Sequence, residues 1–154
     1  MLNTIFPRKV SNDYQGNPIA KWVFIVITLV TIVRSLIHVI APDGGAQSIA
    51  TIPLDNYSKA AAATVILMFS FWGLSQLLIG FVYAIVLWRY QALIPFMYVL
   101  LIIEYGMRII LGLLKPIETA GTAPGGIGNF IFLPIAILML ILSLLKPKQE
   151  GNRL

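Results

Sequence analysis

The chain has 154 residues, of which 58% are hydrophobic and only 11% charged, and its mean hydropathy is +0.88. These values exclude a soluble domain of this length and predict one integral membrane domain covering residues 1–154. The absence of cysteine excludes disulfides and thiol redox chemistry. The net charge of +5 does not indicate nucleic-acid binding, because the basic residues are scattered at the ends of apolar segments.

Four apolar segments predict transmembrane helices at about residues 19–40, 59–88, 92–115 and 129–145. The first has about 20 residues, which at 1.5 Å per residue matches a hydrocarbon core of about 30 Å. The second is close to 30 residues long and must tilt, kink or protrude. A very short turn at residues 89–91 predicts that the second and third helices are antiparallel neighbours. The expected fold is an all-α four-helix bundle with up-down topology.

Polar residues of the first helix recur every three or four positions and include Arg34 and His38, so they should form one stripe that faces protein. The second helix carries Gln76, its strongest polar residue, which could form a hydrogen bond across the bundle. It also carries a stripe of small residues that favours close helix packing: Ser70, Gly73, Gly80 and Ala84.

The connection at residues 41–58 is long and contains two prolines and two glycines. It is either a plain linker or a lid that folds back over the mouth of the bundle. The second long connection, residues 117–128, is rich in glycine. The basic tail at residues 146–154 is expected to be frayed.

Basic residues are distributed unequally between the two ends of the predicted bundle. One end holds seven of them, and the other holds only Lys59 and Lys115. The positive-inside rule therefore predicts a multi-pass protein of the cell membrane with both termini in the cytoplasm and both long loops outside. The seven residues are Arg8, Lys9, Lys21, Arg89, Lys146, Lys148 and Arg153.

The third helix carries Glu104 and Arg108, one turn apart on the same face. Arg34 lies 13 residues after Lys21, and Glu104 lies 14 after Tyr90, so both should lie about 20 Å from the cytoplasmic face. A charge inside a membrane helix costs about 2.5–3.5 kcal/mol and usually finds a partner. We therefore expect Arg34 and Glu104 to be direct partners, with Arg108 competing for the same carboxylate.

Three interpretations of this polar cluster stay open. In the first, Arg34 and Glu104 form a structural ion pair, Arg108 extends outward and His38 is hydrogen-bonded in the core. In the second, the net positive charge of an outward-facing pocket suits a small anionic or lipid-like ligand. In the third, His38 and Glu104 serve a small proton-linked transporter. The expected ligand-binding residues are Arg34, His38, Gln76, Glu104 and Arg108.

The four-span layout, with the segment Glu104-Tyr105-Gly106-Met107-Arg108 (EYGMR) in the third helix and an arginine in the first, resembles small bacterial DoxX-like membrane proteins. This resemblance implies an accessory inner-membrane protein with no catalytic residues to transfer. A subunit of a membrane protein complex, or a homo-oligomer, is thus the main alternative to a ligand-binding protein. No metal-ligand spacing, cofactor motif or nucleophile-base pair is present in the sequence, and we expect neither enzymatic activity nor a cofactor.

Overall fold

The computed structural model describes residues 1–145, and within them the secondary structure is helical. Four long helices, α2 (Pro18–Ile40), α3 (Lys59–Arg89), α4 (Ile94–Leu114) and α5 (Pro124–Leu144), are each long and apolar enough to cross a membrane. Three short helices accompany them, α1 (Leu2–Ile5), η1 (Leu54–Asn56) and η2 (Gln91–Leu93). The prediction of four long apolar helices in an all-α chain is confirmed.

Local capping sets where the long helices begin. The side chain of Asn17 accepts a hydrogen bond of 2.9 Å from the Ile19 N–H, directly before Pro18 at the first helical position. Ser58 caps α3 in the same way through the Ala61 N–H. The expected start of the fourth helix at residue 129 is wrong by five residues, because Pro124 occupies its first turn and the glycines after it are helical.

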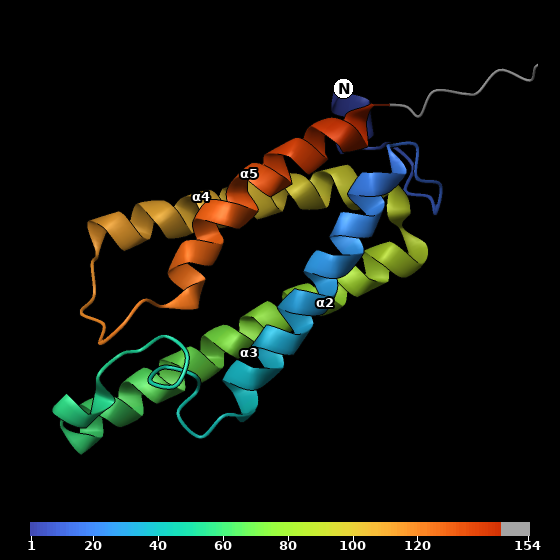
Figure 1. Cartoon of the computed structure of the whole chain (residues 1–154). Coiled ribbons are helices and arrows are strands. Elements are labelled where there is room, and N and C mark those ends of the chain that lie inside the picture. Colours follow the sequence, from blue (N-terminus) through green and yellow to red (C-terminus); the bar gives the residue numbers. More distant parts are fainter. Residues whose placement is uncertain (146–154) are drawn as a thin grey trace, which may run out of the picture.

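The four helices form two antiparallel pairs, α2 with α3 and α4 with α5 (Figure 1). Tyr90 and η2 join α3 to α4, so these two helices are antiparallel as predicted. They are not packed neighbours, however, because the two pairs diverge away from this turn and meet mainly through α2 and α5. We call the end with the 90–93 turn the turn end, and the end with loops 41–58 and 115–123 the loop end.

Glycines in α3 allow close packing against α2. A Cβ at Gly73 would lie 2.6 Å from the Cβ of His38, and one at Gly80 would lie 2.8 Å from Cγ1 of Ile32. Gly73 and Gly80 are therefore packing positions, in agreement with the predicted stripe of small residues.

The main hydrophobic core lies in the half of the molecule near the turn end, where all four long helices contribute. The ring of Phe24 lies 5.2 Å from that of Tyr83 and 5.6 Å from that of Tyr98, measured between centroids. The Tyr98 hydroxyl donates to the Ala20 carbonyl at 2.6 Å. This core holds the two helix pairs together at one end, and their separation at the other end leaves room for a cavity.

The N-terminal segment packs against the turn end. The Ala92 N–H donates to the Ser11 carbonyl and the Asn17 N–H to the Leu142 carbonyl, each at 3.2 Å. Burial raises the pKa of Tyr14 to about 12, and its hydroxyl donates to the Asn17 carbonyl at 3.0 Å. Residues 1–17 are thus joined to η2 and α5.

Loop 41–58 folds back along α3, so the plain-linker interpretation is wrong. Its side chains Ala46, Ile52 and Leu54 form a second apolar cluster against α3. Desolvation alone would raise the pKa of Asp43, but hydrogen bonds from the backbone N–H groups of three loop residues lower it to about 2. The loop is therefore a folded cover at the loop end.

Thr51 joins the two loops. This residue has a φ of +56°, its carbonyl accepts from the Ala120 N–H at 2.8 Å, and its hydroxyl donates to the Gly121 carbonyl at 2.9 Å. These hydrogen bonds connect the α2–α3 pair with the α4–α5 pair at the loop end.

The described basic residues follow the predicted separation between the two ends. Arg8, Lys9, Lys21 and Arg89 lie in segments at the turn end, whereas Lys59 and Lys115 adjoin the loops. Lys146, Lys148 and Arg153, with the predicted frayed tail, lie outside the described residues.

Candidate ligand cavity between the two helix pairs

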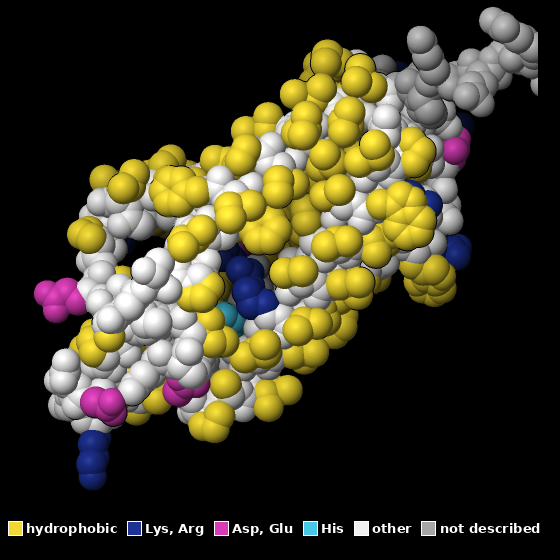
Figure 2. Space-filling model, viewed as in Figure 1, with side chains coloured by type: hydrophobic (Ala, Val, Ile, Leu, Met, Phe, Trp, Pro, Cys, Tyr) yellow, Lys and Arg dark blue, Asp and Glu magenta, His cyan; other side chains and the backbone are white. Residues whose placement is uncertain are grey.

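A cavity of about 800 Å³ lies between the two helix pairs, in the half of the molecule near the loop end. Figure 2 shows it as a hollow in which basic and histidine side chains are visible among hydrophobic ones. Most of its lining is apolar, and its polar groups are few. The lining comes from all four long helices and from loops 41–58 and 115–123: Val30, Thr31, Arg34, Ile37, His38, Ile49, Ala50, Met68, Phe69, Trp72, Tyr105, Arg108, Leu111, Ala123, Pro124, Gly125, Gly126, Gly128, Asn129 and Phe132.

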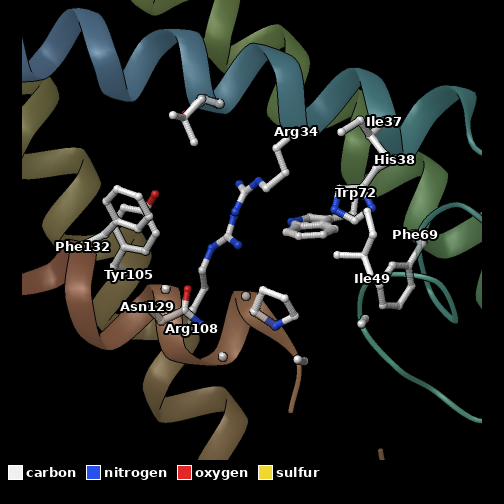
Figure 3. Close-up of a pocket in the computed structure, with 18 of the residues that line it drawn as sticks. Arg34, Ile37, His38, Ile49, Phe69, Trp72, Tyr105, Arg108, Asn129 and Phe132 are labelled. Atoms are coloured by element: carbon white, nitrogen blue, oxygen red, sulfur yellow. The ribbon is translucent and has the colours of Figure 1, made fainter. Parts of the chain in front are cut away.

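Arg34 extends from α2 into this cavity (Figure 3). One of its terminal nitrogens donates to Oε1 of Gln76 at 3.3 Å, a long hydrogen bond to a neutral acceptor. Its Nε is buried and has no hydrogen-bond partner in the described part of the chain. Arg34 therefore carries a positive charge into the cavity and forms no salt bridge with any residue from 1 to 145.

Arg108 forms an ion pair with Glu104, through Nη2 and Oε1, one turn apart on α4. This is the only salt bridge among residues 1–145, so the predicted direct pairing of Arg34 with Glu104 is wrong. An i,i+4 partner on the same helix is already within reach, whereas Arg34 would have to cross the space between two separated helices. The pair keeps partial exposure, with 18% of the Arg108 side chain and 23% of the Glu104 side chain accessible.

Trp72 of α3 lies beside both arginines. The guanidinium carbon of Arg34 is 5.4 Å from the centroid of its ring, and that of Arg108 is 4.9 Å away. Figure 3 shows the two guanidinium groups pointing toward one another next to this ring. Cation–π attraction of about 0.5–2 kcal/mol per arginine helps to hold both cations in an apolar setting.

His38 lies at the side of the cavity nearest loop 41–58. Its Nδ1 lies 2.7 Å from the Gly44 carbonyl oxygen, which can only accept, so Nδ1 carries the proton. The ring also packs against Trp72, with centroids 4.8 Å apart. His38 therefore connects the loop to the aromatic wall of the cavity.

The opposite wall is aromatic as well. The rings of Tyr105 and Phe132 are stacked with centroids 5.3 Å apart and planes 17° from parallel. Arg108 also lies over Tyr105, at 5.8 Å from the ring centroid. Aromatic surfaces thus enclose the two guanidinium groups from both helix pairs.

The five residues singled out from the sequence form one connected cluster. Arg34, His38 and Arg108 line the cavity, Gln76 supports Arg34, and Glu104 supports Arg108. The formal charges of the two arginines and the one glutamate sum to +1.

Sequence reasoning missed Trp72, Tyr105, Phe132 and the lining contributed by the first turn of α5. One signal for Trp72 was present, because it lies four residues before Gln76 and far from the ends of its helix, where interfacial tryptophans usually lie. No local signal placed residues 124–128 in the wall, since their glycines indicated a loop.

Comparisons with protein-family models, curated proteins and solved structures found no match to this chain. The resemblance to DoxX-like proteins therefore stays a prediction from the sequence.

Proposed function

We propose that this protein is a multi-pass membrane protein that binds a small anionic or lipid-like molecule in the cavity between its two helix pairs. The observation that carries the proposal is the meeting of Arg34 and Arg108 beside one aromatic ring, where Glu104 forms a salt bridge with Arg108 alone. Two like charges in an apolar cavity repel each other strongly because the local dielectric is low. An anion bound there offsets that repulsion.

The chemistry of arginine supports an anionic ligand. A guanidinium presents five donors in a planar fork that matches a carboxylate or a phosphate. Arg34 lines the cavity, is only partly buried, and uses one donor on Gln76. A ligand oxygen that accepts from its remaining terminal N–H groups would form a charge-assisted hydrogen bond worth about 1.5–3 kcal/mol.

The dimensions of the cavity support a ligand of small-molecule size. Its volume of about 800 Å³ lies within the range of about 300–1,000 Å³ for such pockets, which are mostly apolar with a few placed polar groups. A molecule with one charged group and an apolar body fits this distribution.

We further propose that the four long helices cross the cell membrane with both termini in the cytoplasm, so that the cavity faces outward under the two loops. The charge separation between the turn end and the loop end supports this orientation. Reporter fusions in loop 41–58, in the 90–93 turn and after residue 145 test it. An external reporter at the turn would reverse the orientation.

An accessory subunit in a membrane complex is the main alternative function, and a proton-linked transporter the second. The transporter receives less support, because His38 and Glu104 already have partners at the Gly44 carbonyl and Arg108. The predictions that the protein has no enzymatic activity and no metal or cofactor stay predictions.

Ligand binding is tested by thermal unfolding of the purified protein in detergent, with a panel of anions, while co-purifying lipids and proteins are identified by mass spectrometry. A ligand at 100 times its dissociation constant should stabilise the protein by about 2.7 kcal/mol. Arg34→Gln should remove most of that stabilisation, and Arg89→Gln is the matched control because Arg89 is exposed and far from the cavity. Equal responses from both variants, or from neutral compounds, would refute an anion site. A stoichiometric co-purifying protein would favour the subunit function.

A further inference from the structure

We infer that the ligand is a membrane-resident amphiphile with one acyl chain and a monoanionic head of the carboxylate type, and that it enters sideways from the lipid between the two helix pairs. This inference rests on the proposed function, since it specifies which anion the cavity binds.

The opening of the cavity points to lipid. Figure 2 views the molecule across its helix axes, and the hollow with its basic side chains is visible from this side. Cavity-lining residues on both sides of the opening are apolar and exposed: Val30, Ile37, Met68 and Leu111. Side chains of this kind around an opening exclude hydrated ions and are compatible with acyl chains.

The other route, from the loop end, is covered. Ile49 and Ala50 of loop 41–58 line the cavity, and Thr51 joins this loop to the second one through two hydrogen bonds. A water-soluble anion arriving from outside would meet this cover first, whereas a molecule already dissolved in the bilayer reaches the side opening directly.

The depth of the charged groups suits a lipid of the outer leaflet. Arg34 lies six residues before the end of α2 at Ile40, and Arg108 six residues before the end of α4 at Leu114. Both helix positions are therefore about 9 Å from the loop end of their helices at 1.5 Å per residue. Val30 and Phe132 line the cavity as well, and Val30 lies one helical turn deeper than Arg34. A head at the arginines leaves the chain against this apolar wall, directed toward the bilayer centre.

The charge of the site favours a monoanion. Glu104 neutralises one of the two arginines, so a carboxylate brings the cluster to zero net charge. A phosphate monoester carries about −1.5 to −2 and would leave the cavity negative. An anionic phospholipid with a phosphodiester head has the right charge, but it carries two acyl chains. The cavity would have to hold both chains beside the two guanidinium groups.

Selectivity must come from the head group. Lipid tails are as apolar as leucine, so moving an acyl chain from the bilayer into this cavity contributes little free energy. The chain determines instead where the molecule is concentrated, and the arginines determine which amphiphiles are retained. A neutral amphiphile of equal chain length should therefore bind much more weakly.

Trp72 offers a direct test, because it lies beside both arginines and only Trp22 and Trp88 must be changed to make it the single tryptophan. Both of these are exposed, at 67% and 76%. The full chain with Trp22→Phe and Trp88→Phe is placed in phosphatidylcholine vesicles at alkaline pH. Trp72 fluorescence is then followed while a fatty acid brominated along its chain, or the brominated alcohol of equal length, is added.

The expected result is saturable quenching by the brominated fatty acid at a membrane fraction at least tenfold below that needed for the alcohol. Arg34→Gln should lower the apparent affinity at least tenfold. Val30→Phe, which narrows the proposed path of the chain, should weaken binding, while Val33→Phe, on the exposed face outside the cavity, should not. The comparison of acid with alcohol needs no change in the cavity, so it holds even if a variant fails to fold.

Competition distinguishes failure of this inference from failure of the proposed function. If acetate or inorganic phosphate displaces the fatty acid at concentrations as low as those of the fatty acid itself, the inference that the ligand is an amphiphile that enters from the lipid is overturned. That result would leave the proposed anion site standing. Equal displacement by phosphatidylglycerol would overturn the single acyl chain. Quenching that is neither saturable nor dependent on Arg34, with no competition by any anion, would overturn both proposals.

Discussion

Replacing Glu104 by glutamine is the change that most directly tests the charge arrangement of the cavity. It removes the only carboxylate that forms a salt bridge with an arginine among the described residues, and leaves two guanidinium groups beside Trp72. Breaking a fully buried pair by removing one partner costs about 3–5 kcal/mol. Because 18% and 23% of the two side chains remain exposed, solvent screening reduces the expected loss to about 2–3 kcal/mol.

Arg34→Gln should behave differently. It removes a long hydrogen bond to Gln76 and one cation–π contact, worth about 0.5–1 kcal/mol each, but it also removes a cation that forms no salt bridge within the part of the chain that the structure describes. These effects offset one another, so the free energy of unfolding should change by no more than about 1 kcal/mol. The double variant Glu104→Gln/Arg34→Gln should recover at least about 1 kcal/mol of the Glu104→Gln loss, because the repulsion between the two arginines disappears.

Thermal or denaturant unfolding in detergent of the two single variants and the double variant measures these differences, with Arg89→Gln as the exposed control. The reasoning is refuted if Arg34→Gln costs as much as Glu104→Gln and the double variant shows no recovery. That outcome would mean that Arg34 is the partner of the carboxylate, as the sequence alone suggested.

Two further predictions concern packing and the loop. Gly73→Ala should destabilise the protein by about 1–3 kcal/mol in the same unfolding assay, because the new Cβ would lie 2.6 Å from that of His38. Its control is Gly106→Ala, which has open space around it and should be neutral or slightly stabilising. Equal effects of the two substitutions would show that α2 and α3 do not pack closely at Gly73. Asp43→Asn should speed hydrogen exchange of the backbone amides that donate to Asp43 in loop 41–58. In the unmodified protein, the stabilisation from these hydrogen bonds should be present at neutral pH and be lost as the pH falls from 3.8 toward the folded pKa of about 2. The exposed Glu118→Gln is its control, and unchanged exchange in Asp43→Asn would contradict the role of these hydrogen bonds.

The sequence by itself determined the helices and the identity of the charged residues. Long apolar segments specify helices because backbone polar groups in an apolar surrounding must be satisfied within the segment, and spacing by four residues placed Glu104 and Arg108 on one face. The small side chains at Gly73 and Gly80 indicated close packing in the same way, since that requirement is local to one helix face. The start of α5 was predicted too late, because Pro124 begins a helix through residues that individually favour a loop.

Only the tertiary structure decided which charges pair and where the cavity lies. Depth along the helices placed Arg34 level with Glu104, but depth carries no information about the separation of two helices or their rotation about their axes. The aromatic core around Phe24 closes the helix pairs at the turn end and lets them diverge at the loop end. That divergence keeps Arg34 from Glu104, brings it to Trp72 instead, and opens the space between the two arginines. These contacts join residues distant in sequence, so no local pattern could specify them.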